Sequence, residues 1–164
     1  MNKNKKTSGQ LLIESLIGVS IVVVGLLGIV GLVSRSLSLN RVVSDQFTAS
    51  FLSLEGIEIA RNLIDSNIIE GRPWNSGFEN NNPSVLYEVD YKSGSLRNYS
   101  GNYLRLNNEG FYGYDAGSNT PFRRKIAVEN KGEEIAVNSI VEWSSRGGEY
   151  EINNEHHFYN WRTE

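Results

Sequence analysis

The chain has no cysteine and only three prolines in 164 residues. Without cysteine it can form neither a disulfide framework nor a thiolate metal site. No proline occurs before Pro73, so the residue that breaks helices most strongly is missing from the first part of the chain. The formal net charge of −3 is mildly acidic. That charge argues against a general nucleic-acid-binding surface, which needs a basic face to neutralise phosphates.

Charge is also nearly absent from one long stretch near the N-terminus. The residues from Leu11 to Val33 are apolar apart from a few small polar side chains and Glu14. As a helix, this run reaches roughly 34 Å, which is enough to cross a bilayer core of about 30 Å. It is too long for the apolar part of a secretory signal peptide. The preceding lysines are Lys3, Lys5 and Lys6. Their position predicts a single-pass membrane protein with its N-terminus in the cytoplasm.

Glu14 is the one charged residue in this run, and it requires an explanation. On insertion scales a carboxylate near the bilayer centre costs roughly 2.5 to 3.5 kcal/mol, and less toward the interface. A short basic leader that ends in Gly9, followed by Gln10 and then by Glu14 five residues after that glycine, resembles the class III signal of type IV prepilins and pseudopilins. Gln10 stands where that family most often has phenylalanine or methionine.

The resemblance implies a processing and assembly pathway. A prepilin peptidase would cut after Gly9 and methylate the new amine of Gln10. Glu14 would then pair with the amine of a neighbouring subunit, because two buried charges are tolerable in an apolar fibre core only when they are paired. The alternative is that Glu14 reaches the interface from the end of a simple membrane anchor.

Three glycines lie in the second half of the apolar run, at Gly25, Gly28 and Gly31. Glycine weakens a helix in water, and in membranes it also lets helices approach closely. Two interpretations stay open. These are ordinary membrane-helix glycines, or they let the helix pack tightly or melt locally when it leaves lipid for a fibre core.

After the apolar run the pattern becomes that of an amphipathic helix. Apolar residues follow helical spacing at Phe47, Phe51, Leu54, Ile57, Ile64 and Ile68. We expect one helix from about Thr7 or Leu11 to about Ile68, which ends at Glu70-Gly71-Arg72-Pro73. Its apolar face is expected to pack on a sheet.

The remainder of the chain alternates between short apolar runs and turn residues. The predicted strands are Val85–Tyr91, Tyr103–Leu106, Phe111–Tyr114, Phe122–Val128, Ile135–Trp143 and Tyr150 to about Phe158. We expect an α+β fold in which a meander of antiparallel strands packs on the long helix. The predicted divisions are a leader at 1–9, an assembly and membrane segment at 10–34, an amphipathic helix at 35–69 and a β-rich head at 70–164.

The head offers little support for catalysis or metal binding. His156 and His157 are adjacent, so on a strand they point to opposite faces and cannot form a two-ligand site. The loop at 115–119 has oxygen donors for calcium but lacks an EF-hand spacing. Arg123, Arg124 and Lys125 lie in an alternating strand pattern, which predicts solvated positions. Short fragments such as Glu55-Gly56-Ile57-Glu58 and Asn160-Trp161-Arg162 resemble the sequences of minor pilins.

Three functional hypotheses follow. The first is a structural subunit, of the minor-pilin kind, in a type IV pilus or pilus-like filament. Its partners would be other subunits, the prepilin peptidase, the inner-membrane assembly platform and, before assembly, membrane lipid. The second is a pseudopilin of a type II secretion or DNA-uptake machine. The third is an uncleaved, signal-anchored surface protein whose β-rich head binds a ligand. None of the three is an enzyme or needs a cofactor.

Overall fold

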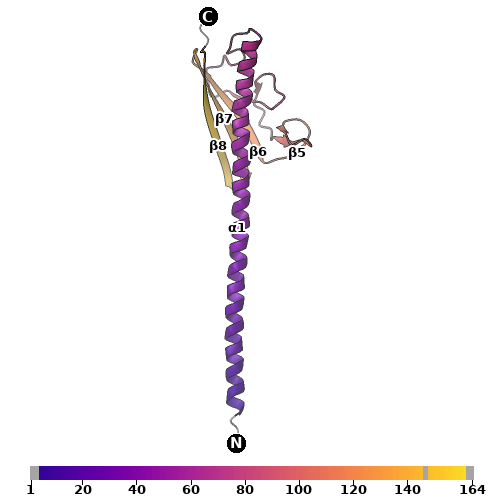
Figure 1. Cartoon of the computed structure of the whole chain (residues 1–164), viewed down its shortest axis with the longest axis vertical. Helices are drawn as coiled ribbons and strands as arrows, with labels where there is room; N and C mark the ends of the chain where they lie inside the picture. Colours follow the sequence, from indigo (N-terminus) through magenta and orange to yellow (C-terminus); the bar gives the residue numbers. More distant parts are fainter. Residues whose placement is uncertain (1–3, 146–147, 162–164) are drawn as a thin grey trace. The chain divides into compact units, whose positions relative to one another are not determined.

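A computed structural model describes residues 4–145 and 148–161, with side chains from Gly9 onward. The chain divides into two units, Met1–Val43 and Ser44–Glu164. Helix α1 (Asn4–Ile69) runs through both, and it confirms the expected single helix that ends near Ile68 (Figure 1). Gly71 ends the helix with a φ of 71°. Its N–H bonds to the Ile68 carbonyl at 3.2 Å, and glycine adopts this left-handed conformation without a Cβ penalty.

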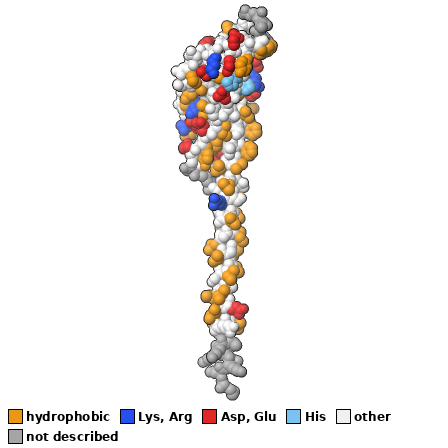
Figure 2. Space-filling model, turned by 90° about the vertical axis from the view of Figure 1, so that its left-hand side faces the viewer, with side chains coloured by type: hydrophobic (Ala, Val, Ile, Leu, Met, Phe, Trp, Pro, Cys, Tyr) orange, Lys and Arg blue, Asp and Glu red, His pale blue; other side chains and the backbone are white. Residues whose placement is uncertain are grey.

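The first unit consists of the N-terminal part of α1. Every large apolar side chain from Leu11 to Val33 is exposed, with exposed fractions between 47% and 72%. Figure 2 shows these hydrophobic side chains along the helix. The helix is long and apolar enough to cross a membrane, in agreement with the predicted span.

The second unit, which we call the head from here on, contains the rest of α1 and two antiparallel sheets. The larger sheet has the order β2-β1-β6-β7-β8. Its strands are β1 (Leu86–Glu88), β2 (Arg97–Asn98), β6 (Phe122–Asn130), β7 (Glu134–Ser145) and β8 (Gly148–Tyr159). The smaller sheet, β4-β3-β5, consists of β3 (Arg105–Leu106), β4 (Tyr112–Gly113) and β5 (Ser118–Asn119). The α+β fold with a long N-terminal helix packed on an antiparallel sheet is therefore confirmed.

The expected single meander is wrong, because the strands form two sheets. β2 was not predicted, and β5 lies within a segment that was read as a turn. Both have only two residues, which is too short for an alternating pattern to be recognised. The long strands β6, β7 and β8 coincide with predicted runs. In β7 the residues Ile135, Val137, Val141 and Trp143 are all buried, as their shared parity predicts.

The core lies between α1 and the larger sheet, in two neighbouring clusters. The first cluster combines four residues of α1 with residues of the sheet and the loops. Its members are Ile57, Ile59, Ala60 and Ile64 of α1, together with Phe78, Val89, Ile126, Val128, Ile135 and Val137. Around the second, Ala49 and Leu52 pack with Leu104, Phe122, Val141 and Trp143. Buried apolar area of this kind is the main stabilising contribution to the head.

The predicted packing face of the helix is wrong in its first half. Ile57 and Ile64 are buried as expected, but Phe47, Phe51 and Leu54 are 63%, 69% and 51% exposed. The buried row in this region uses small or polar residues, namely Ala49, Ser53, Gly56 and Ala60. Small side chains let the helix backbone approach the sheet closely. The larger apolar residues are therefore displaced to the outer face.

Gly56 lies where helix and sheet approach each other closely. A Cβ at this position would overlap the Ser139 Oγ and would lie 3.1 Å from the Arg124 Cδ and from the Ile126 Cδ1. Beside it, the Ser53 hydroxyl donates to the Ser139 carbonyl at 2.6 Å and accepts from the Asn154 amide at 3.0 Å. Hydrogen bonds here hold helix and sheet together where apolar side chains have no room.

The expectation that Arg123, Arg124 and Lys125 are all solvated is wrong for Arg124, whose side chain is fully buried. Its guanidinium donates to the Leu52 carbonyl of α1 and to Glu55 Oε2, each at 2.9 Å, and to the Val89 carbonyl after β1 at 2.7 Å. A buried guanidinium is tolerated only when it is paired and hydrogen-bonded. Arg124 thus connects the helix to two parts of the sheet.

Candidate functional site

The predicted processing and assembly residues lie close together on α1 in the first unit. Gly9, Gln10 and Glu14 are all exposed. The positions one turn from Glu14 on its helix face are Gln10, Leu11, Ile17 and Gly18, and none of them is cationic. Among the residues with described side chains, Glu14 has no ion pair. The arrangement provides an exposed carboxylate on an apolar helix, and a charge partner must come from elsewhere.

Gly25, Gly28 and Gly31 also lie on this helix. A Cβ added at any of the three would meet nothing within 4 Å. No contact within the described chain therefore requires glycine at these positions, in contrast to Gly56. Their proposed role in helix flexibility or close helix packing stays a prediction.

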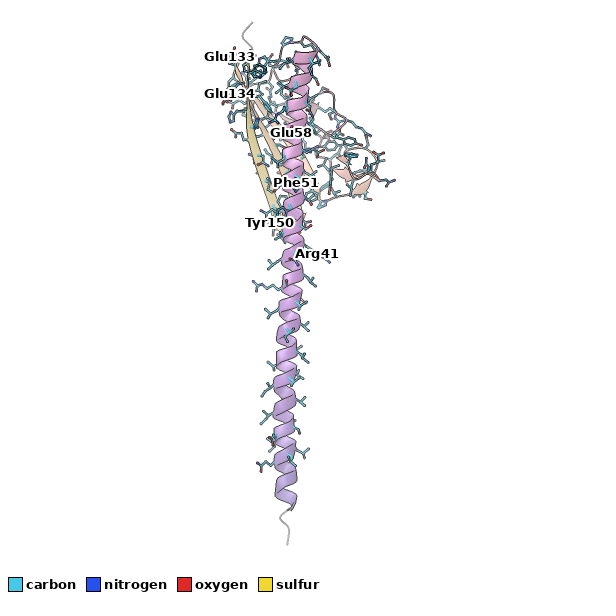
Figure 3. All side chains as sticks on the ribbon, viewed as in Figure 1. Arg41, Phe51, Glu58, Glu133, Glu134 and Tyr150 are labelled. Atoms are coloured by element: carbon cyan, nitrogen blue, oxygen red, sulfur yellow. The ribbon has the colours of Figure 1, made fainter. Side chains whose placement is uncertain are left out.

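The outer row of α1 in the second unit changes character along its length. We define the outer row as the exposed positions Phe47, Phe51, Leu54, Glu58, Asn62 and Asp65, which follow helical spacing. Figure 3 labels Phe51 and Glu58 on this helix, on either side of the change. The row is apolar up to Leu54 and polar from Glu58 onward. Phe47, Phe51 and Leu54 form an apolar stripe in helical register that is more than half exposed. Phe51 also lines a shallow cavity with Phe111 and Tyr112.

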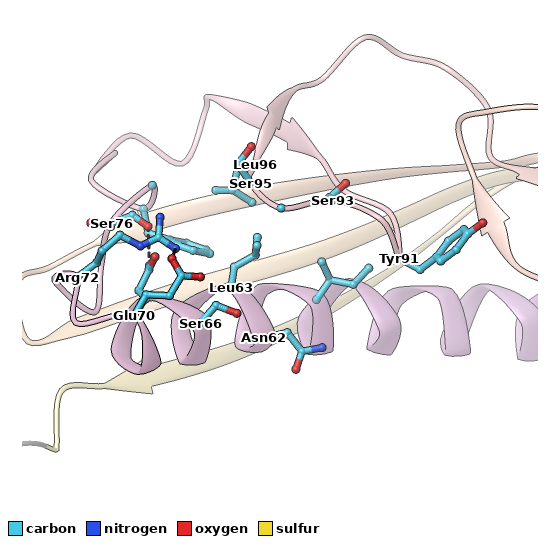
Figure 4. A pocket seen from close by; sticks show the side chains of 15 residues that line it. Asn62, Leu63, Ser66, Glu70, Arg72, Ser76, Tyr91, Ser93, Ser95 and Leu96 are labelled. Atoms are coloured by element: carbon cyan, nitrogen blue, oxygen red, sulfur yellow. Dashed lines mark hydrogen bonds and ion pairs between the residues drawn. The ribbon is translucent and has the colours of Figure 1, made fainter.

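A cleft of about 310 Å³ opens between the last turns of α1 and the loop that follows β1 (Figure 4). We call it the serine cleft. The helix lines it with Asn62, Leu63 and Ser66, and the loop lines it with Ser93, Ser95 and Leu96. At one end the Arg72 guanidinium pairs with the Glu70 carboxylate at 3.0 Å. Sequence reasoning missed this cleft, because its serines and asparagines come from segments about 30 residues apart and none of these segments forms a motif.

Two buried polar side chains hold the walls of the serine cleft. The Asn67 amide donates to the Trp74 carbonyl at 3.2 Å and to the Ser76 carbonyl at 2.8 Å, which fixes the loop after the helix. Asp90 Oδ1 accepts from the Lys92 N–H at 3.1 Å and from the Ser93 hydroxyl at 2.9 Å, which fixes the opposite loop. Both residues are 3% exposed.

The Asp90 carboxylate has a lowered pKa. Burial alone would raise the pKa of this group, but hydrogen bonds from Ser93 and from the Lys92 N–H outweigh it. The Arg97 guanidinium, at 3.2 Å, lowers the pKa further. Asp90 is therefore ionised at neutral pH, and as a carboxylate it accepts the hydrogen bonds from the Lys92 N–H and the Ser93 hydroxyl of its loop.

The two histidines of β8 point to opposite faces, as predicted. His156 faces α1, where its Nε2 lies 3.4 Å from the Arg61 guanidinium. His157 faces outward between Glu134 and Glu155, at 2.5 Å and 2.7 Å, and hydrogen bonds to these two carboxylates raise its pKa. Within residues 4–145 and 148–161, no group of three or more histidines or acids is placed to hold a metal ion.

The loop considered for calcium is partly occupied in other ways. Asp115 pairs with the Lys92 ammonium at 3.3 Å, and Ser118 and Asn119 form β5. A carboxylate already paired with lysine is a weaker ligand for a cation, so this loop gains no support as a metal site.

No family model, curated protein or solved structure matches this chain.

Proposed function

We propose that this protein is a structural subunit of a type IV pilus or pilus-like filament, cut after Gly9 and polymerised through its apolar N-terminal helix. The observation that carries the proposal is the length of the exposed apolar surface of α1. Exposed apolar side chains run from Leu11 to Val33 in the first unit, and more follow in the second unit at Phe47, Phe51 and Leu54.

A bilayer cannot cover all of this surface. Its core accommodates about 20 helical residues, and the run from Leu11 to Val33 already fills it. Phe47 lies 14 residues beyond Val33, and Leu54 lies farther still. Exposed apolar stripes of this kind mark interaction sites. In a filament, the helices of neighbouring copies supply the missing cover.

Glu14 fits the same proposal. As an exposed carboxylate in an apolar span it is unfavourable in lipid, and the helix positions one turn away from it hold no cation. Removal of the leader after Gly9 would create an amine at Gln10, one helical turn before Glu14 in each copy. Pairing of that amine with Glu14 of a neighbour would neutralise both charges and would also fix the axial register between copies.

The pathway that follows has defined partners. Before assembly, the chain would be a single-pass membrane protein with its N-terminus in the cytoplasm, a substrate of the prepilin peptidase. An inner-membrane assembly platform would then move it into an extracellular or periplasmic filament. The protein itself would perform no catalysis. A pseudopilin of a secretion or DNA-uptake machine would use the same residues in the same way.

The direct test is mass spectrometry of the protein isolated from its own host. The proposal predicts an N-terminus at Gln10 that carries one methyl group. A chain that retains Met1 and the leader would instead identify an uncleaved surface anchor.

A second test addresses Glu14. The variant Glu14→Ala should abolish or strongly reduce incorporation into filaments, while membrane insertion persists. Ser15→Ala is the matched control, because the Ser15 hydroxyl bonds only to the Leu12 carbonyl of its own helix. Equal incorporation of both variants would remove the proposed role of Glu14.

A further inference from the structure

The serine cleft has no role in the filament proposal, and its size suggests a small ligand. Its volume of about 310 Å³ is at the lower end of the range of small-molecule sites, about 300 to 1,000 Å³. A single ring-sized molecule fits such a volume, whereas a folded partner does not.

The side chains that line the serine cleft combine hydrogen-bonding and apolar groups. Among the described residues, no side-chain hydrogen bond engages Asn62, Ser66 or Ser95. Amides and hydroxyls both donate and accept, so these three can bind groups that do the same. Leu63 rises from the helix toward the loop that carries Leu96 and provides an apolar surface beside them (Figure 4).

The charge of the cleft favours a neutral ligand. Glu70 and Arg72 are the charged residues among those that line it, and they neutralise each other across 3.0 Å. A charged ligand would lose its hydration without gaining a partner of opposite charge.

We propose that the serine cleft binds one uncharged sugar residue. Its hydroxyl groups bond to Asn62, Ser66 and Ser95, and one C–H face of its ring packs on Leu63 and Leu96. Sugars fit this lining because each hydroxyl donates and accepts, while the axial C–H bonds make one face of the ring apolar.

The walls of the cleft are already in place without a ligand. Asn67 fixes one loop and Asp90 fixes the other, both from buried positions. A preformed site avoids the entropy cost of ordering loops on binding, which is important for a ligand with few atoms. The inference is independent of the filament proposal, since it concerns only the head.

The test uses the full chain in micelles of a detergent without a sugar headgroup. Saturation-transfer NMR is recorded with the methyl glycosides of glucose, galactose, mannose and N-acetylglucosamine. We expect saturable binding of at least one of them, with a dissociation constant on the order of 1 mM. Glucuronate and glucosamine, which are charged, should bind at least about tenfold more weakly.

Two matched variants locate the site. Ser95→Leu should weaken binding at least about tenfold, whereas Ser118→Leu, at an exposed serine in β5, should leave it unchanged. If Ser95→Leu lowers the melting temperature, Asn62→Ala replaces it, because alanine at this exposed helix position favours the helix. Absence of saturable binding by all four glycosides, unchanged binding in the cleft variant, or equal binding of glucuronate would each overturn the proposal.

Discussion

The two units of this chain differ in the surroundings of their apolar side chains and glycines. In the first unit every large apolar residue from Leu11 to Val33 is exposed, and a Cβ added at any glycine there would meet nothing within 4 Å. In the second unit the apolar residues of β6, and those of β7 apart from Ile140, are buried, and Gly56 is enclosed by side chains of the sheet. The head is thus specified by contacts within one chain. The apolar side chains of the first unit have no such cover from their own chain, and in our proposal lipid and then other copies supply it.

The largest expected effect tests the buried guanidinium of the head. Arg124→Met should lower the free energy of unfolding of the head by about 3 kcal/mol, because Glu55 and two backbone carbonyls lose their partner. Urea unfolding followed by tryptophan fluorescence measures it. Arg123→Met is the control. Arg123 is half-buried and lies over the Tyr103 ring at 5.0 Å, so its loss should cost less than about 1 kcal/mol. Equal costs would contradict the assigned role of Arg124.

Adjacent residues on α1 give the next comparison. Leu52 is 3% exposed and belongs to the core, whereas Phe51 is 69% exposed. Leu52→Ala should destabilise the head by about 2 to 4 kcal/mol, and Phe51→Ala by no more than about 0.5 kcal/mol. The proposal reverses this order for filament incorporation per folded molecule, where Phe51→Ala should be the more harmful. A large stability loss from Phe51→Ala would show that this side chain packs within the head.

These residues also show how far the sequence allowed prediction. Length, absence of proline and helical spacing were enough to predict α1, and alternating runs bounded by turn residues were enough to predict β6, β7 and β8. The helix face was wrong at Phe47, Phe51 and Leu54, because hydrophobic spacing marks two rows here and cannot tell which faces a sheet. The small residues Ser53 and Gly56 carried that information, through the close approach that they permit.

The candidate sites divide in the same way. Gly9, Gln10 and Glu14 could be proposed because their spacing is local in the sequence. Arg124 and the serine cleft could not, since both depend on segments that only the fold brings together. A charged residue in an alternating strand is solvated far more often than buried, and nothing local distinguishes Arg124 from Arg123.

Two glycines extend the comparison between the units. Gly56→Ala should destabilise the head by about 1 to 3 kcal/mol, because the new Cβ would overlap the Ser139 hydroxyl. Gly28→Ala should leave head stability unchanged, since its Cβ would meet nothing within 4 Å. Urea unfolding of both variants in the same micelle provides the measurement. A tolerated alanine at position 56 would contradict the tight approach of helix and sheet.

The smallest expected effect concerns His157. Hydrogen bonds to Glu134 and Glu155 raise its pKa, so the protonated form is favoured in the folded state. This contribution to stability is complete below about pH 6.5, the ordinary value for histidine, and it is lost as pH rises through the folded pKa. NMR titration should give a pKa for His157 above 6.5. The urea midpoint of the unmodified protein should therefore fall as pH rises through this pKa, and His157→Gln should abolish that fall. A folded pKa at or below 6.5 would contradict the pairing of His157 with Glu134 and Glu155.

The central claim is that other copies cover the apolar part of the outer row. Its most direct test is chemical cross-linking, which is possible because the chain contains no cysteine of its own. Ser44→Cys places a single thiol on the face of Phe47 and Phe51, one turn before Phe47. In intact host cells, a short bis-maleimide should link this variant into a ladder of dimers and higher multimers, while Ser118→Cys should give fewer. A thiol at position 44 that reacts with maleimide yet yields only monomers would contradict the account.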